Sequence, residues 1–226
     1  MMIILIGGTK GGGGKTTVAV NLAIELGILT GAEDKSVFLM DADIQGSAIN
    51  WIGTRMSNQL TPEIKCARRN QQEPAGSLVQ SVRSLNETYK YVIVDCGGYD
   101  GPAFRAMLSV CNLLVFPVQP TQLDLWAVEK TAELVNLAKS FNPDINVMAV
   151  LSRCSSLPNS TDADGAREYI EGLEIDGLKI PVAKTVIKNR VSYQRCASEG
   201  KGVVELSDQK AKEEIRSLAR EIVNGI

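Results

Sequence analysis

The chain has 226 residues, of which 44% are hydrophobic and 22% are charged, with a formal net charge of −2 at pH 7. This balance argues against a disordered tail and against a protein that holds nucleic acid by its overall charge. A chain of this length buries an ample core, so we expect a single α/β domain over residues 1–226.

Cysteine and histidine usage excludes further classes. Five scattered cysteines without a C-x-x-C pair argue against a disulfide framework, a zinc site and an iron–sulfur site, and predict buried free thiols. There is no histidine, so proton transfer or water positioning falls to carboxylates, lysines, hydroxyls or backbone groups. The apolar runs are strand-sized and the first residues lack a signal-peptide pattern, so we expect a cytoplasmic protein.

The first predicted elements enclose a block of glycines. Residues 2–6 form an apolar run, residues 11–14 are all glycine, and a helical pattern covers residues 18–27. Glycine backbones can turn successive N–H groups onto a phosphate, and the start of the helix adds a partial positive charge. The predicted phosphate site consists of Gly11, Gly12, Gly13, Gly14, Lys15, Thr16 and Thr17, with the Lys15 ammonium on the phosphates and the Thr16 hydroxyl on Mg²⁺.

A second lysine makes this loop more specific. Thr9 stands where the general phosphate-loop pattern has its first glycine, and Lys10 directly precedes the glycine block. Residues 10–16 resemble the deviant Walker A motif of the ParA/MinD family of dimerising ATPases. The resemblance implies ATP and Mg²⁺ as cofactors, an ATP-bound homodimer, and a catalytic role for Lys10 at the partner's nucleotide.

The next predicted strand, residues 36–40, leads into Asp41 and Asp43. Two carboxylates at alternate positions after a buried strand point the same way, into the crevice where parallel α/β sheets bind ligands. The family has an Asp-x-Asp-Pro-Gln-like motif here, with Ile44 in place of proline in this chain. The resemblance implies that Asp43 orients the attacking water and that Asp41 supports the Mg²⁺ shell.

A second landmark lies in the middle of the chain. We expect helices at residues 46–55 and 76–85 and an edge strand at residues 63–67. Trp51, in the first of these helices, either packs in the core or contacts the second copy of a dimer. Residues 91–95 then form an apolar run ending in Asp95, which resembles a Walker B strand whose carboxylate holds the Mg²⁺ shell. The glycines of residues 96–100 suggest a switch that senses the γ-phosphate.

The second half continues the alternation. We expect strands at residues 113–118, 146–151 and 178–182, and helices at 123–140 and 166–173. Ser152 stands where the family often has an asparagine that reads adenine, and the resemblance implies nucleotide contacts for Arg153 and Pro181. An apolar stripe in residues 207–226 favours core packing over a membrane-targeting helix, because its polar face mixes both charges.

One local stretch is basic. Between residues 184 and 201 a single glutamate, Glu199, stands against five cations that form a candidate backbone-binding surface for DNA: Lys184, Lys188, Arg190, Arg195 and Lys201. An ordinary solvated helix face is the alternative. No base-reading motif is present, so binding to DNA is expected to be independent of sequence and steeply salt-dependent.

Together these features predict a P-loop NTPase fold, a mostly parallel twisted sheet with helices on both faces. The resemblance implies a small ParA-type ATPase without an N-terminal helix-turn-helix region, with slow, partner-stimulated hydrolysis, nucleoid association, a ParB-like partner and plasmid or chromosome partition. The alternatives are a MinD-like membrane-cycling ATPase, an ATPase that positions a protein cargo, a metabolic synthetase and an iron–sulfur carrier. Stable membrane association is not expected.

Overall fold

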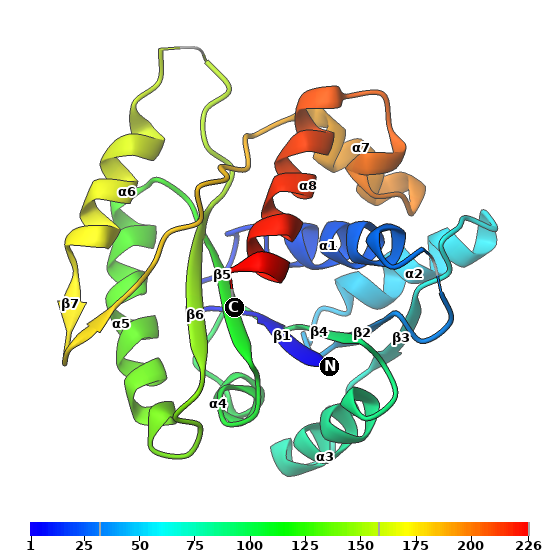
Figure 1. Cartoon of the computed structure of the whole chain (residues 1–226), viewed down its shortest axis with the longest axis horizontal. Helices are drawn as coiled ribbons and strands as arrows, with labels where there is room; N and C mark the ends of the chain where they lie inside the picture. Colours follow the sequence, from blue (N-terminus) through cyan, green and yellow to red (C-terminus); the bar gives the residue numbers. More distant parts are fainter. Residues whose placement is uncertain (32, 158, 226) are drawn as a thin grey trace.

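The computed structural model describes residues 1–31, 33–157 and 159–225 (Figure 1). Its main sheet is parallel and has the strand order β3-β2-β4-β1-β5-β6. The strands are β1 (Met2–Ile6), β2 (Val37–Asp41), β3 (Lys65–Arg68), β4 (Tyr91–Asp95), β5 (Leu113–Val118) and β6 (Asn146–Leu151). The predicted α/β fold with a parallel sheet is confirmed.

Helices cover both faces of this sheet (Figure 1). One layer contains α1 (Lys15–Leu29), α2 (Ser47–Ser57), α7 (Val191–Glu199) and α8 (Gln209–Asn224). The other contains α3 (Ala75–Asn86), α4 (Pro102–Leu108), α5 (Gln122–Lys139) and α6 (Asp162–Gly172). Successive strand residues point to opposite faces, so Ile4 packs in the first layer and Leu5 in the second.

The register of the central strands places two carboxylates side by side. Asp41 ends β2 and Asp95 ends β4, and the two residues are partners in the parallel pairing of these strands. Ile6, the last residue of β1, is the partner of Asp95 on the other side. The loop that leaves β1 therefore starts beside both carboxylates, at the carboxyl edge of the sheet.

The strand expected at residues 178–182 is wrong. Residues Leu178–Lys179 (β8) pair antiparallel with Glu174–Ile175 (β7) in a separate hairpin. The cause is the turn between them, where Asp176 and Gly177 both have positive φ, 49° and 77°, and reverse the chain. Val182 contributes a single parallel bridge to Ala149 of β6.

The apolar stripe of the last helix packs into the core. Ile215, Leu218, Ala219 and Ile222 of α8 are fully buried in the cluster that also contains α1. The core-packing interpretation is thereby confirmed, and this stripe is not available to a lipid surface. Within the described residues, none of the helices combines the length and apolar character required of a membrane span.

Candidate nucleotide-binding site

The loop between β1 and α1 is held in shape by bonds from distant parts of the chain. Gly12 and Gly14 both have φ of +86°, a conformation that favours glycine. A Cβ atom on Gly13 would lie 2.6 Å from the Pro117 carbonyl oxygen. The Ser152 hydroxyl donates a hydrogen bond to the Gly13 carbonyl. The glycine at residue 13 thus lets the loop pack directly against β5.

A cavity of about 540 Å³ opens over this loop. It is lined by Gly11, Gly12, Gly14, Lys15, Thr16, Thr17, Asp43, Ile44, Gln45, Gly98, Tyr99 and Arg153. The fold therefore brings most of the predicted phosphate loop together with Asp43 and Arg153. Lys15 begins α1, and its ammonium donates to the Lys10 carbonyl over 2.6 Å, so it is already bent back over the loop. Burial lowers the pKa of Lys15 from its ordinary value, and nearby carboxylates, Asp95 first, oppose this shift.

The Asp95 carboxylate has the surroundings of a metal-shell ligand. It is fully buried, and both its oxygens lack a hydrogen-bond partner among the described residues. Burial raises its pKa to about 7, and the nearby Thr16 hydroxyl and Lys15 ammonium oppose this shift. A buried carboxylate without donors is unstable alone but suits hydrated Mg²⁺, which uses one or two carboxylates together with waters and substrate phosphates. The residues present fit a magnesium site formed by Asp95 and Thr16.

Asp41 and Asp43 have different environments. Both oxygens of the buried Asp41 accept backbone N–H bonds, from Asp43 over 3.1 Å and from Ile49 over 2.8 Å. Asp41 therefore ties the end of β2 to the first turn of α2, and these bonds compete with its predicted place in the Mg²⁺ shell. Asp43 lines the cavity, and its carboxylate accepts the Gln45 N–H over 2.9 Å. Its position is compatible with the predicted water-orienting role.

Lys10 lies outside the cavity wall. Its ammonium is 2.7 Å from an Asp124 carboxylate oxygen, and its side chain is 38% exposed. Asp124 stands in the first turn of α5, where it also accepts a bond from the Thr121 hydroxyl. The lysine therefore bonds to its own chain beside the nucleotide cavity rather than inside it.

A second cavity of about 420 Å³ shares Gly14, Thr17 and Arg153 with the first. Residues 187–190 and the start of α7 form its far wall, which gives room for the nucleoside next to the phosphates. Ser152 lines this cavity, but its hydroxyl donates its hydrogen bond to the Gly13 carbonyl. Pro181 does not join it: it lies along the middle of β6, where its carbonyl accepts the Ala149 N–H over 2.9 Å.

The five basic residues predicted to bind DNA do not share one environment. Arg190 is bound to Glu214 of α8 at 2.7 Å and faces the second cavity, as does Lys188. Arg195 and Lys201 both pair with Glu199, at 3.7 and 2.8 Å. Lys184 is exposed beside α8. Three of the five cations are therefore already paired within the chain.

The partners in two contacts of the site have no local sequence signal. The side chain of Gln119 donates to the Gly12 carbonyl over 3.1 Å, and Gly98 packs so closely that a Cβ atom would lie 2.4 Å from the Lys10 carbonyl oxygen. Both contacts join the phosphate loop to loops that follow other strands. Only the sheet order reveals them, although the paired glycines 97 and 98 indicated a special backbone.

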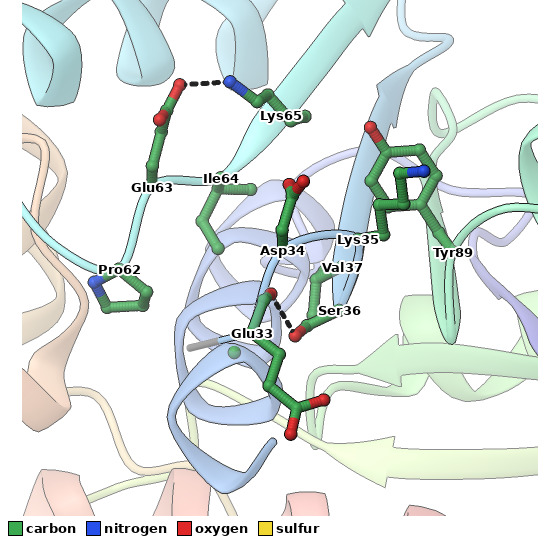
Figure 2. Close-up of a pocket in the computed structure, with 11 residues that line it drawn as sticks. Glu33, Asp34, Lys35, Ser36, Val37, Pro62, Glu63, Ile64, Lys65 and Tyr89 are labelled. Carbon is green, nitrogen blue, oxygen red and sulfur yellow. Dashed lines mark hydrogen bonds and ion pairs between the residues drawn. The ribbon is translucent and has the colours of Figure 1, made fainter. Parts of the chain in front are cut away.

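A further cavity, of about 300 Å³, lies at the opposite edge of the sheet (Figure 2). It is formed where the chain enters β2 and β3, and Lys65 pairs with Glu63 there at 2.5 Å. Parallel sheets bind nucleotides at their carboxyl edge. The cavity over residues 11–17 is therefore the candidate site.

A glycine-rich loop between a strand and a helix, facing aspartates at the ends of neighbouring parallel strands, defines a P-loop nucleotide-binding protein. The family model of the CobQ/CobB/MinD/ParA nucleotide binding domain matches residues 4–203, and the chain belongs to this family. It is accordingly a ParA/MinD-type ATPase whose cofactors are ATP and Mg²⁺.

The similar proteins span nearly the whole chain. Maintenance of carboxysome distribution protein A of Halothiobacillus neapolitanus is 27% identical, over 97% of this chain and 95% of that protein. Chromosome partitioning protein ParA of Myxococcus xanthus is 26% identical, over 98% of this chain and 87% of its own length. The structure of the septum site-determining protein MinD of Pyrococcus horikoshii with Mg-ADP aligns with a TM-score of 0.74 at 19% identity, over 98% of this chain and 95% of that one.

Proposed function

We propose that the chain is an ATP-dependent dimerising switch that positions a protein cargo over DNA. ATP and Mg²⁺ hold two copies face to face, and the dimer binds DNA without regard to sequence. Slow hydrolysis, stimulated by a cargo-bound partner, separates the copies and releases the DNA. In this cycle the nucleotide state controls where the protein is held.

The position of Lys10 carries the proposal. Its side chain is half-exposed next to the nucleotide cavity and pairs with Asp124 at 2.7 Å, outside the set of residues that line the cavity. A lysine so placed contributes little to its own nucleotide but is available to the phosphates of a copy docked on this face. A second copy therefore completes each site, which makes dimerisation depend on the nucleotide.

The proposed hydrolysis uses groups that line the cavity together with the buried Asp95 at the end of β4. Asp43 orients water, Lys15 and the partner's lysine stabilise charge on the phosphates, and Mg²⁺ would be held by Thr16 and Asp95, polarising the phosphate oxygens when bound. The chain has no histidine, and positioning with charge stabilisation is the main requirement of phosphoryl transfer.

The relative named for carboxysome distribution supports a protein assembly as the cargo. Its alignment with this chain covers almost the full length of both proteins. The chromosome-partitioning relative supports the second candidate, partition of a plasmid or chromosome with a ParB-like partner. The buried stripe of α8 argues against a membrane-cycling protein, because its apolar side chains are committed to the core.

The DNA contact is proposed for the surface near Lys184 and α7. Because Arg195 and Lys201 are paired with Glu199, we expect weak binding by one copy and stronger binding by the two surfaces of a dimer. Such binding neutralises phosphates and releases counterions, so it weakens steeply with salt. It would retain the ATP-bound protein on the nucleoid.

The test combines sedimentation with DNA and vesicle binding, each with ATP, ADP and no nucleotide. The proposal expects ATP-specific dimers that bind random-sequence duplex DNA, and expects Lys10→Ala to lose both while it still binds ATP. Lys65→Ala, which alters an exposed lysine at the other edge of the sheet, should match the wild type. ATP-dependent dimers that sediment with vesicles and ignore DNA would contradict the DNA-based function.

A further inference from the structure

Helix α5 presents a stripe of exposed side chains along one face, with large apolar groups toward both of its ends. Its inner side, with Leu125, Val128 and Val135, belongs to the core. On the outer side Leu123 is 64% exposed, Trp126 55% and Leu137 62%, and Phe141, just after the helix, is 81% exposed. Figure 1 shows α5 on the flank of the molecule, across the sheet from α1 and α8. Large apolar groups gathered on one helix face indicate a contact surface.

Two opposite charges lie at the centre of this stripe. Lys130 and Glu133 are exposed and follow the same spacing, so the stripe runs Leu123, Trp126, Lys130, Glu133, Leu137, Phe141. The steps are of three or four residues, as on one seam of a helix that packs against another helix. The order of side chains along the seam is apolar, apolar, positive, negative, apolar, apolar.

This order is complementary to itself when reversed. If a second α5 lies antiparallel against the first about a two-fold axis near residues 131 and 132, Lys130 meets Glu133 of the partner subunit. Trp126 then meets Leu137 of the partner subunit, and Leu123 meets Phe141 of the partner subunit. The two-fold axis repeats each contact, so both ion pairs form and all four apolar side chains are covered. A partner of other composition has no reason to match this symmetry.

We propose that α5 is a self-association surface on which two copies of this chain pair their α5 helices antiparallel. The contact goes beyond the nucleotide switch, because it needs no nucleotide. Leu137 lies about 20 Å along the helix axis from Asp124, which holds Lys10, at 1.5 Å per residue. The carboxyl half of the stripe is therefore remote from the proposed ATP-dependent face.

Two distinct two-fold contacts on one chain allow assemblies larger than a dimer. ATP-bound dimers joined through α5 close as tetramers if the two axes cross at right angles, and otherwise extend into rows. A single helix pair is a small interface, so we expect a dissociation constant on the order of tens of micromolar. Association of that strength is slight for free protein and substantial for copies concentrated on one DNA molecule.

A charge swap tests the pairing by sedimentation equilibrium of the full chain without nucleotide. Glu133→Lys sets like charges opposite each other twice, and should weaken the dimer on the order of fivefold. The double variant Lys130→Glu/Glu133→Lys recreates both ion pairs with reversed sense and should restore it. Glu133→Lys is the primary single variant, because Lys130 also lies 3.8 Å from Asp100.

Two further variants complete the design. Leu137→Glu changes an exposed side chain and should abolish the nucleotide-free dimer while it leaves the ATP-dependent dimer in place. Glu168→Lys makes the same charge change at an exposed position of α6 and should behave as the wild type. A wild type that stays monomeric at about 200 µM, well above the expected constant, overturns the proposal. A double swap that stays as weak as Glu133→Lys overturns the antiparallel pairing.

Discussion

At the residue scale, Gly98 shows how closely the loop after β4 meets the phosphate loop. A Cβ atom on it would lie 2.4 Å from the Lys10 carbonyl oxygen and 2.5 Å from the Gly11 Cα atom. Both neighbours are backbone atoms, so no side chain can rotate away to make room. The loop that follows Asp95 and the loop that binds phosphate thus cannot move independently at this point.

We therefore expect Gly98→Ala to lower ATP affinity at least about tenfold, since a displacement of either loop disturbs the N–H groups that face the phosphates. Titration calorimetry with ATP and Mg²⁺ measures this directly. Gly76→Ala is the matched control, because a Cβ atom there meets open space in α3 and should leave affinity unchanged while stabilising the helix slightly. Equal affinity for both variants would show that the two loops are not coupled.

Glu25 is a buried acid outside the nucleotide site. It lies on α1 with 4% exposure, its Oε2 atom has no hydrogen-bond partner among the described residues, and it faces Arg216, Arg220 and Glu213 of α8. Burial raises its pKa above the ordinary value of 4.5, and the two arginines oppose this shift. The folded chain thus holds this proton to higher pH than the unfolded chain does.

This difference fixes the sign of a pH effect. The raised pKa of Glu25 stabilises the folded state fully below about pH 4.5. This stabilisation is lost as the pH rises through the folded-state pKa. Glu25→Gln cannot ionise, so at pH 7 it should be more stable than the wild type by about 1 kcal/mol in urea unfolding, with the advantage shrinking toward acid pH. Glu87→Gln, at an exposed position, should show no such trend. A Glu25→Gln effect that is the same at every pH would contradict the assignment.

At the scale of elements, α2 is fastened at both ends. Asp41 accepts the Ile49 N–H in its first turn, and Trp51 donates its indole N–H to the Lys201 carbonyl over 3.1 Å. Arg55, 1% exposed, forms a bidentate ion pair with Glu205 and also donates to the Gly200 carbonyl. The helix that follows the Asp43 loop is thereby joined to the turn after α7, and Trp51 serves in packing.

Arg55→Ala should destabilise the fold by about 3 kcal/mol, because Glu205 loses its paired cation and the Pro62 and Gly200 carbonyls lose their donors. Arg55→Lys should recover only part of this, since an ammonium cannot reproduce the planar fork. Urea unfolding followed by circular dichroism gives both values. Arg83→Ala on the exposed side of α3 is the control, and a comparably small loss for Arg55→Ala would show that the buried pair contributes little net stability.

The sequence predicts those elements whose boundaries coincide with the ends of a local apolar run. Strands β4, β5 and β6 begin and end where their apolar runs do, at Tyr91–Asp95, Leu113–Val118 and Asn146–Leu151. The hairpin at β7 and β8 escaped because its turn depends on positive φ at Asp176 and Gly177, which the apolar pattern of residues 178–182 does not reveal.

At the scale of the whole molecule, the site depends on which strands are neighbours. The motif residues Lys15, Thr16 and Asp95 could be predicted because each stands beside its own strand or helix. The contact of Lys10 with Asp124 could not, since it joins residues 114 positions apart through the pairing of β1 with β5. The self-complementary order of side chains along α5 likewise could not be predicted, because it depends on which side of that helix is buried.

That same long-range contact leads to a prediction about the proposed switch. Lys10 must leave Asp124 before it can reach the nucleotide of another copy, so the 2.7 Å ion pair opposes dimerisation. Asp124→Asn keeps a side chain able to bond Thr121 but removes the charge that holds the lysine. Each copy breaks one such pair, and partly exposed ion pairs contribute up to about 1 kcal/mol each, so ATP-induced dimers should form at a protein concentration up to about thirtyfold lower.

Light scattering across a protein dilution series with ATP and Mg²⁺ measures that concentration. Asp164→Asn, which removes an exposed carboxylate from the first turn of α6, is the control and should leave it unchanged. If Asp124→Asn instead raises the concentration needed, the aspartate stabilises the dimer more than it restrains the monomer. In that case Lys10 would still contact Asp124 in the dimer. The conformational change that allows the second copy to dock would then involve the loop around Gly98.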